Sequence, residues 1–400
     1  MIKKKPLSIL LILCLFFVSS SLLPSIFAYA ANPTDPKLMD QWGWLNIYAD
    51  VCYSNGYRGD SSILVAVIDT GIDLTHPDLQ GNIYTNPGEI CNGIDDGDPN
   101  LMIDDIHGWN FVDNNNDTSD HDGHGSHCAG IIAAISNDIG VCGVAPEVQI
   151  LPIKVIETRT GNLDVLDNAI AYAILMGADI ISMSIGADPD GIAPVLKAQI
   201  NAQIAIAYAL GIILVAAAGN DEANKVSYPA SNPNVIAVAA TTKSNGHAYY
   251  SNWGPEIEIA APGGDQNGAI TSTYNESNYA ILGGTSMACP HVSGVVALMM
   301  QWNSSFTPDD IRAKIADTAI DLGTLGTDQY FGAGLINAAG CLDLPMKHTY
   351  NPIVDWFLSN IWWIGLIGIG VILLIVYKAT QKGSRAGPSI SYSSSSPEYY

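Results

Sequence analysis

Short apolar runs alternate with longer helical patterns through the middle of the chain. The runs are rich in Val, Ile and Ala and end near Gly, Asp or Asn, as strands buried on both faces do. Between them, residues 165–177 and 194–211 have helical spacing and close with Gly177 and Gly211. This alternation predicts an α/β fold with a doubly wound, mostly parallel sheet and helices on both faces. The expected strands are ILVAVIDTG (63–71), VQILPIKVI (148–156), ADIISMSIG (178–186), GIILVAAAGN (211–220) and NVIAVAAT (234–241).

The two ends of the chain carry long apolar segments of different kinds. Residues 1–30 begin with a cluster of lysines, continue in an apolar run and end in Ala-Tyr-Ala, which predicts a signal peptide cleaved after Ala30. Residues 356–377 hold no charge, have Trp and Tyr at their borders and are long enough to cross a bilayer. We expect one transmembrane helix there, preceded by a short linker, 346–355.

Basic residues set the expected orientation of this helix. Lys378, Lys382 and Arg385 follow it directly, so the positive-inside rule places the Ser- and Tyr-rich tail, 378–400, in the cytoplasm. The globular domain, 31–345, is then expected outside the cell, held at the cell membrane by the C-terminal helix.

The chain is strongly acidic. Its 400 residues include 16 Lys and Arg against 39 Asp and Glu, a formal net charge of −23. Between residues 31 and 355 there are 10 basic and 38 acidic residues, a difference of −28. Such a surface repels nucleic acid, which we exclude as a partner, and it can hold cations. Acidic residues also keep a protein soluble, and composition does not separate these two interpretations.

Six cysteines remain once the signal peptide is removed. Outside the cell they can form three disulfides, for which 15 pairings exist, and the sequence does not choose among them. No CxxC pair occurs, so a zinc site has no support. The six are Cys52, Cys91, Cys128, Cys142, Cys289 and Cys341.

Polar residues end three of the expected strands, where the functional groups of such sheets gather. Asp69 ends the first, Ser184 lies near the end of the third, and Asn220 ends the fourth. His124 lies between two glycines before an apolar helical pattern, and Ser286 begins another such pattern. The N–H groups at a helix start stabilise an oxyanion, although a serine at that position is also an ordinary helix cap.

These residues are of the types that nucleophilic catalysis needs. A serine attacks only when a base takes its proton, imidazole is a suitable base, and a carboxylate holds that imidazole in one tautomer. Asp69, His124 and Ser286 are the candidates for these roles. Cys128 and Cys289 follow His124 and Ser286 by one helical turn, and we expect them to be buried free thiols.

Five motifs give a resemblance to a known family. VAVIDTGIDLTHPDL, GHGSHCAG, SMSIG, AAAGN and GTSMACPHVSG occur in the order Asp, His, Ser and resemble the signatures of subtilisin-like serine proteases. The similarity runs from about Gln41 to FGAGLINAAG at 331–340, and HCAG resembles the thiol-containing branch with thermitase and proteinase K. The resemblance implies the subtilisin-like fold and a peptidase domain over 31–345.

The resemblance assigns a role to each catalytic candidate. Asp69 would orient His124, His124 would act as general base and then as acid, and Ser286 would be the nucleophile. The amide of Asn220 and the backbone N–H of Ser286 would stabilise the tetrahedral oxyanion. His127 would be structural.

The resemblance also implies protein or peptide substrates. Ser184, Ile185 and Gly186 resemble the strand that pairs with an extended substrate backbone, and the segment around Gly161 would form the opposite strand. Pairing through the main chain predicts cleavage of unfolded or loop segments with modest side-chain selectivity.

Calcium is the metal that the resemblance implies, because the candidate ligands are oxygen atoms. The loop ISNDIGVCGVAP resembles the tight calcium loop of the family. Its expected ligands are the side chains of Asp35, Asp78 and Asn137 and the carbonyls of Ile135, Ile139 and Val141.

Two further acidic segments are candidate calcium sites, with a solvated acidic loop as the alternative at each. The segment GWNFVDNNNDTSDHDGHG offers Asn110, Asp113, Asn115 and Asp117. The segment GIDDGDPNLMIDD does not fit the EF-hand pattern and offers Asp96, Asp98, Asn100 and Asp104.

The sequence therefore predicts a membrane-anchored, extracellular and monomeric serine endopeptidase. Two alternatives remain: a catalytically silent binding ectodomain stabilised by calcium, and a processing protease of narrow specificity. The presence of all four catalytic residue types argues against a silent binding ectodomain. Cleavage of a peptide library would distinguish a processing protease of narrow specificity from a protease of broad specificity.

Overall fold

A computed structural model describes residues 32–94, 100, 102–158 and 163–349. The expected signal peptide, transmembrane helix and tail, and residues 350–355 of the expected linker, lie outside the described residues. Within the described residues, no helix combines the length and apolar character needed to cross a membrane.

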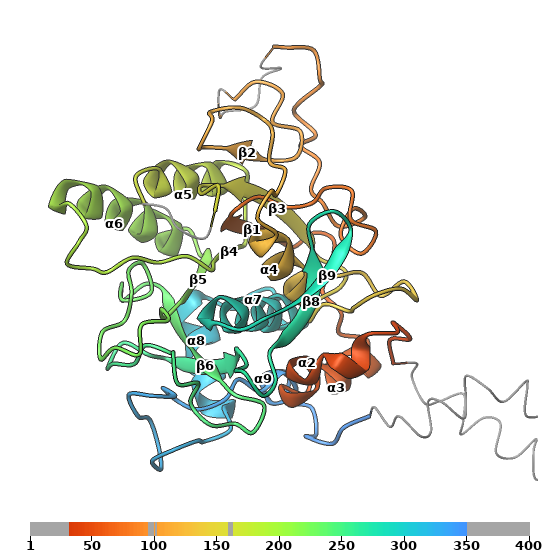
Figure 1. Ribbon diagram of the computed structural model, residues 1–400, viewed down its shortest axis with the longest axis vertical. Helices are drawn as coiled ribbons and strands as arrows, with labels where there is room; N and C mark the ends of the chain where they lie inside the picture. Colours follow the sequence, from red (N-terminus) through yellow and green to blue (C-terminus); the bar gives the residue numbers. More distant parts are fainter. Residues whose placement is uncertain (1–31, 95–99, 101, 159–162, 350–400) are drawn as a thin grey trace, which may run out of the picture. The chain divides into compact units, whose positions relative to one another are not determined.

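Seven parallel strands form the main sheet of the described chain (Figure 1). Their order is β2-β3-β1-β4-β5-β6-β7. The chain passes from β1 to the edge strand β2, places β3 between these two, and then adds β4 to β7 in turn on the other side of β1. This confirms the predicted doubly wound, parallel sheet. The strands are β1 (Leu64–Asp69), β2 (Trp109–Asn110), β3 (Gln149–Lys154), β4 (Ile180–Met183), β5 (Ile213–Ala217), β6 (Ile236–Thr241) and β7 (Ile259–Pro262).

All five predicted strands are present, as β1, β3, β4, β5 and β6. The short edge strands β2 and β7 have no counterpart in the predicted set. Neither has the antiparallel hairpin of β8 (Ile270–Tyr274) and β9 (Asn278–Leu282).

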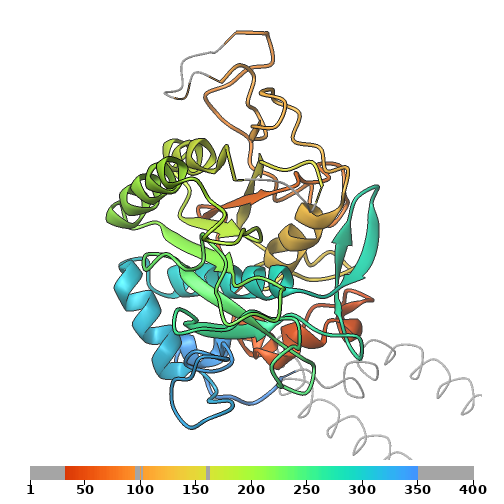
Figure 2. The same cartoon turned by 60° about the vertical axis from the view of Figure 1, so that its left-hand side comes forward.

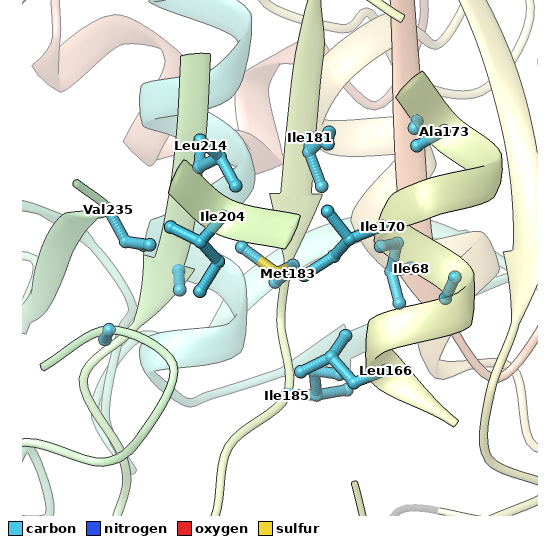
Figure 3. Close-up of a cluster of buried hydrophobic side chains, with 14 of the residues drawn as sticks. Ile68, Leu166, Ile170, Ala173, Ile181, Met183, Ile185, Ile204, Leu214 and Val235 are labelled. Carbon is cyan, nitrogen blue, oxygen red and sulfur yellow. The ribbon is translucent and has the colours of Figure 1, made fainter. Parts of the chain in front are cut away.

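One face of the sheet is covered by α5 (Leu166–Leu175) and α6 (Pro194–Ala209), which correspond to the two helices predicted between strands. Ile68, Ile181 and Leu214 point from the strands toward Ile170 of α5 and Ile204 of α6 (Figure 3). These side chains belong to one large buried apolar cluster, which holds both helices on this face.

The other face is covered by α4 (His124–Ala133) and α7 (Thr285–Trp302), and Figure 2 shows the layers from a second side. Side chains alternate along a strand, so Ser182 points away from its neighbour Ile181 and accepts a hydrogen bond from Ser293 of α7 at 2.9 Å. Helix α7 is buried over most of its length. The remaining helices are η1 (Leu38–Asp40), α2 (Trp42–Asn46), α3 (Ala49–Ser54), α8 (Pro308–Thr318) and α9 (Ala338–Cys341).

The carboxyl ends of β1, β4 and β5 lie side by side, because these strands are neighbours in the sheet. Asp69 is the last residue of β1, Ser184 follows β4, and Asn220 lies three residues beyond β5. The topology thus gathers at one edge the polar residues that the sequence analysis selected.

Candidate active site

The end of β1 and the first turn of α4 bring Asp69 and His124 into contact. His124 Nδ1 lies 2.7 Å from Asp69 Oδ1, and both side chains are buried. The approach depends on Gly125, because a Cβ at this position would stand only 2.1 Å from the carbonyl oxygen of Gly71. The glycine after His124 therefore lets the helix start close against the end of the strand.

Two further residues, which the sequence analysis did not select, tie the same two elements together. Thr70 Oγ1 donates to Asp120 Oδ1 at 2.9 Å and accepts from the backbone N–H of Gly125 at 2.9 Å. Asp120 also accepts from the backbone N–H groups of Gly123, at 2.8 Å, and Ser126, at 2.9 Å. Thr70 and Asp120 thus fix the start of α4 relative to Asp69.

The electrostatics of the pair favour a charged imidazole. Burial by itself opposes the charged form of His124, but the adjacent Asp69 carboxylate outweighs it and holds the pKa of His124 above its ordinary value. Oδ2 of Asp69 is buried and has no hydrogen-bond partner within the described residues. Both hydrogen bonds of this carboxylate are therefore made by Oδ1, one with the imidazole and one with the backbone N–H of Thr70, at 2.7 Å.

A cavity of about 300 Å³ lies beside these residues and is lined by His124, Ser286 and Asn220. Ser286 is in the first turn of α7, where backbone N–H groups have no partner within the helix. Asn220 Oδ1 accepts hydrogen bonds from the backbone N–H and the hydroxyl of Thr285, at 2.9 and 3.0 Å. Its carboxamide oxygen is thereby fixed, which leaves the NH₂ donors for the cavity.

The strand expected to bind substrate lies along this cavity. Ser184, Ile185 and Gly186 line it, and Ser286 Oγ donates to the carbonyl oxygen of Ser184 at 3.2 Å. Gly161, expected on the opposite strand, lies outside the described residues.

The cavity is also lined by residues that the sequence analysis did not select, and two of them are the polar residues Asp221 and Ser227. Asp221 directly follows Asn220, so its position after the AAAGN motif was the available signal. Ser227 is brought into place by the fold alone, since Ala187 and Tyr228 pair as a β-bridge beside it.

Cys128 and Cys289 are buried, as predicted, and so is His127. His127 Nε2 lies 3.1 Å from the carbonyl oxygen of Ile270, and burial lowers the pKa of His127 to about 3. Cys128 Sγ lies 3.9 Å from His124 Nδ1, and burial raises the pKa of both the Cys128 and the Cys289 thiols. All six cysteines that follow the expected signal peptide are free thiols in this structure.

The loop after α4 brings together residues expected at the first calcium site. Asp78 is fully buried, and its Oδ1 has no hydrogen-bond partner among the residues that the structure describes. Burial raises the pKa of Asp35, and the charge of Asp78 adds to the shift. A buried carboxylate oxygen without a donor, near a second carboxylate, fits a divalent cation with oxygen ligands. The carbonyls proposed as further ligands accept no hydrogen bond from any described residue: Ile135, Ile139 and Val141.

Other side chains of this loop are already engaged with protein groups. Asn137 Oδ1 accepts from the backbone N–H of Ile139 at 3.1 Å, and its Nδ2 donates to the carbonyl oxygen of Pro77 at 3.2 Å. Asn137 therefore shapes the loop as well as being a candidate ligand.

The second candidate calcium segment forms a tight turn. Asn110 and Asn115 pair as a β-bridge, and Asn110 Nδ2 donates to Asp113 Oδ2 at 3.0 Å. Asp117 accepts from the backbone N–H of Ser119 at 3.1 Å. The backbone N–H of Asp117 donates to Asn115 Oδ1 at 2.9 Å, so the structure brings all four expected residues of this segment into one connected turn.

The third candidate segment is described only in part. Asp96 and Asp98 lie outside the described residues. Asn100 donates to Asp105 Oδ2 at 2.9 Å, and Asp104 accepts from the backbone N–H of Gly93 at 2.9 Å. The two described members therefore bond to different protein groups.

A carboxylate, an imidazole and a serine at the edge of a doubly wound sheet are the residue types that a serine hydrolase uses. Comparison with known proteins gives the family: residues 60–334 match the model of the subtilase family, and the chain belongs to it. It is a subtilisin-like serine protease.

Three relatives show the extent of the similarity. Subtilisin Savinase of Lederbergia lenta is 36% identical over 298 residues, which cover 74% of this chain and 96% of that protein. Thermitase of Thermoactinomyces vulgaris is 35% identical over 314 residues, covering 77% and 98%. The thermophilic serine proteinase of Bacillus sp. (strain AK1) is 36% identical over 316 residues, covering 78% and 70%.

Proposed function

We propose that the protein is a membrane-anchored extracellular endopeptidase in which Asp69, His124 and Ser286 form the catalytic triad. The observation that carries this proposal is the 2.7 Å contact of His124 with Asp69 beside a cavity that His124 and Ser286 both line. The imidazole accepts the proton of the Ser286 hydroxyl as Ser286 attacks the scissile carbonyl, and Asp69 stabilises the imidazolium that forms.

The oxyanion that develops is stabilised by two donors of different origin. The backbone N–H of Ser286 lies at the start of α7, and the Asn220 NH₂ group is aimed by the bonds that fix its oxygen. Donors held in place before the reaction stabilise the developing charge without reorganisation. His124 then gives its proton to the leaving amine, and a water molecule activated by the same imidazole releases the acyl group from Ser286.

Protein or peptide substrates would lie along Ser184, Ile185 and Gly186 in extended form. This segment follows β4 and lines the cavity next to Ser286, so its backbone can pair with a substrate strand. Recognition through the main chain favours unfolded or loop segments as substrates. The protein would act as a monomer, because one chain carries the complete set of catalytic groups.

Calcium would support this protease by holding loops together. The Asp78 site is the strongest candidate, because its orphaned buried oxygen needs a donor or a cation. The location outside the cell and the membrane anchor rest on the sequence patterns of 1–30 and 356–377.

One labelling experiment tests both the chemistry and the location. A fluorophosphonate probe should label the full-length chain in the membrane fraction of cells that express it, and Ser286→Ala should abolish the label. Deletion of 356–377 should move the labelled band to the soluble fraction. Equal labelling of Ser286→Ala would refute the nucleophile, and a soluble full-length band would refute the anchor.

A further inference from the structure

A chain of polar contacts runs between the end of β3 and the segment that leads to His124. Lys154, the last residue of β3, has a side chain that is only 1% exposed, although it carries an ammonium group. Its Nζ lies 2.7 Å from Glu157 Oε2 and donates to the carbonyl oxygen of Ser119 at 2.9 Å. Glu157 Oε1 in turn lies 2.8 Å from His121 Nδ1. The proposed catalytic chemistry uses none of these contacts.

Glu157 is the residue that joins the two segments. Its carboxylate bridges the buried ammonium group of Lys154 and the imidazole of His121, which is 64% exposed. The hydrogen bond from Lys154 lowers the pKa of the Glu157 carboxyl, so the carboxylate is charged at neutral pH. A buried ammonium group needs such a counter-charge, because removal of one partner leaves the other uncompensated. The contact with Lys154 therefore fixes where the Glu157 carboxylate lies.

The segment that contains Ile156 has few other polar restraints. Ile156 lines the cavity and packs against the large apolar cluster. The backbone N–H of Val155 donates to the carbonyl oxygen of Asp69 at 2.9 Å. Beyond this bond, the backbone of Ile156 and Glu157 makes no hydrogen bond with any residue that the structure describes. Among those residues, the Glu157 side chain is therefore the polar contact that holds this part of the cavity wall.

The other end of the chain of contacts is held independently of Glu157. Thr70 and Asp120 fix the start of α4 against the end of β1. His121 directly follows Asp120, so the backbone around it is held by the same bonds. Loss of the Glu157 carboxylate should therefore leave the catalytic groups in place and loosen the cavity wall instead.

We propose that Glu157 is a positioning residue for substrate binding, which holds the Ile156 side of the cavity in place relative to His124. The inference rests on the proposed protease function, because it assigns the cavity to the substrate. Glu157 touches no reacting atom and acts through its neighbour. A wall that has to be ordered when the substrate binds lowers affinity, so loss of the Glu157 charge should raise KM and leave kcat nearly unchanged.

Glu157→Gln tests the proposal on the full-length protein, because it keeps the size of the side chain and removes the charge. With one peptide substrate, we expect KM to rise about fivefold, the size that a partly exposed ion pair allows, and kcat to stay within about twofold of wild type. The rate of labelling by a small fluorophosphonate probe, which needs the triad but not the whole cavity, should also stay within about twofold. His121→Gln, which breaks the other contact of the carboxylate, should raise KM as well.

A double variant separates positioning from folding. Glu157→Gln leaves the Lys154 ammonium group buried without its carboxylate, so in the Ser286→Ala background it should lower the thermal midpoint. Adding Lys154→Met removes the buried charge as well and should recover most of the midpoint, because neutral groups often replace a buried ion pair without loss. In the active enzyme, KM of the double variant should stay raised, since the charged bridge to His121 is still absent. A KM that returns to the wild-type value together with the midpoint would show that the ion pair only supports the fold, and would overturn the proposal.

Glu147→Gln is the matched control. It makes the same substitution ahead of β3, at a carboxylate that is 56% exposed and pairs with Arg58. KM of this variant should stay within about twofold of wild type. An unchanged KM in Glu157→Gln, or an equal rise in Glu147→Gln, would refute the role given to Glu157 while the wild type still cleaves the peptide. If the wild type neither cleaves the peptide nor takes the fluorophosphonate label, the proposed function fails and this inference with it.

Discussion

At the scale of single residues, the site depends on burial and on the hydrogen bonds that hold each side chain in place. His124 is buried, its ring is fixed by Asp69, and its backbone is fixed through Thr70 and Asp120. A general base in this setting is positioned before substrate arrives, which removes the cost of orienting it during the reaction. Thr70 and Asp120 are as buried as Asp69 and His124.

The Asp69–His124 contact predicts a pH dependence with a defined direction. In the proposed mechanism only neutral His124 can accept the proton of Ser286, and Asp69 holds the pKa of His124 above 6.5. Activity should therefore fall as the pH drops through a value above 6.5, the pH at which half of the imidazole is protonated. Asp69→Asn should shift this limb to lower pH, because the stabilising charge is gone, and should lower kcat by a factor on the order of 10⁴.

The measurement is a pH–rate profile of kcat/KM for wild type and Asp69→Asn on one peptide. Asp317→Asn serves as the control, because it also removes one carboxylate but does so at an exposed residue of α8. A limb that stays at the same pH in Asp69→Asn would contradict the role given to the carboxylate.

Single-residue patterns explain which parts of the site could be predicted. Asp69, His124, Asn220 and Ser286 stand in short motifs that contain glycine or serine at fixed spacing, and these motifs mark tight turns. Asp120 has no such local mark. Its importance comes from hydrogen bonds to residues up to 50 positions away, which no sequence window contains.

At the scale of elements, the strands that could be predicted lie in long apolar runs, whereas β7 was missed although it is buried at every position, because it has only four residues. The β1, β5 and β6 strands are buried at every position, so they appear as continuous apolar runs. The β2 strand has two residues inside a polar segment, and β9 is partly exposed along its whole length. These two segments are strands because they pair with neighbouring strands, and their sequences carry no continuous apolar run.

The loop after α4 predicts a stability that depends on calcium. Asp78 Oδ1 is buried without a donor, so metal binding would satisfy it and removal would leave a buried charge uncompensated. Calcium at about 100 times its Kd would stabilise the folded protein by roughly 2.7 kcal/mol per site. In the Ser286→Ala background, which prevents self-digestion, chelator should lower the thermal midpoint and added calcium should restore it.

Variants of this loop make the test specific. Asp78→Asn should reduce the difference between the midpoints in calcium and in chelator, because the site loses a charged ligand. Asp317→Asn should retain the full difference. The same midpoint for the Ser286→Ala protein in both conditions would rule out a stabilising calcium site.

At the scale of the whole described domain, the topology brings together residues that no single motif contains. Strand order places the ends of β1, β4 and β5 together, although more than 140 residues separate Asp69 from Asn220. The cavity residue Ser227 is added by the bridge between Ala187 and Tyr228. The alternation of strands and helices predicted this gathering in outline, whereas the side chains that close the cavity depend on the fold in three dimensions.

The two ends of the described domain meet at a buried carboxylate, Asp50 in α3. Asp50 Oδ2 accepts from the backbone N–H of Thr349 at 2.8 Å, and Asp50 Oδ1 lies 3.1 Å from His348 Nδ1. The His348 ring stacks on Tyr48 with the centroids 4.4 Å apart. Asn32 Nδ2 donates to the carbonyl oxygen of Thr349 at 3.3 Å, so the first described residue joins the same contact.

This arrangement predicts that Asp50 stabilises the domain although it lies outside the active site. Asp50→Ala leaves the backbone N–H of Thr349 and the ring of His348 without their acceptor, and unmade hydrogen bonds of this kind cost about 1–3 kcal/mol. Thermal denaturation in the Ser286→Ala background should show a clearly lower midpoint for Asp50→Ala. Asp190→Ala, which removes a carboxylate whose side chain is 85% exposed, should change the free energy of unfolding by less than about 1 kcal/mol. Equal midpoints for the two variants would show that the contact between the chain ends and α3 contributes no more than a surface ion pair.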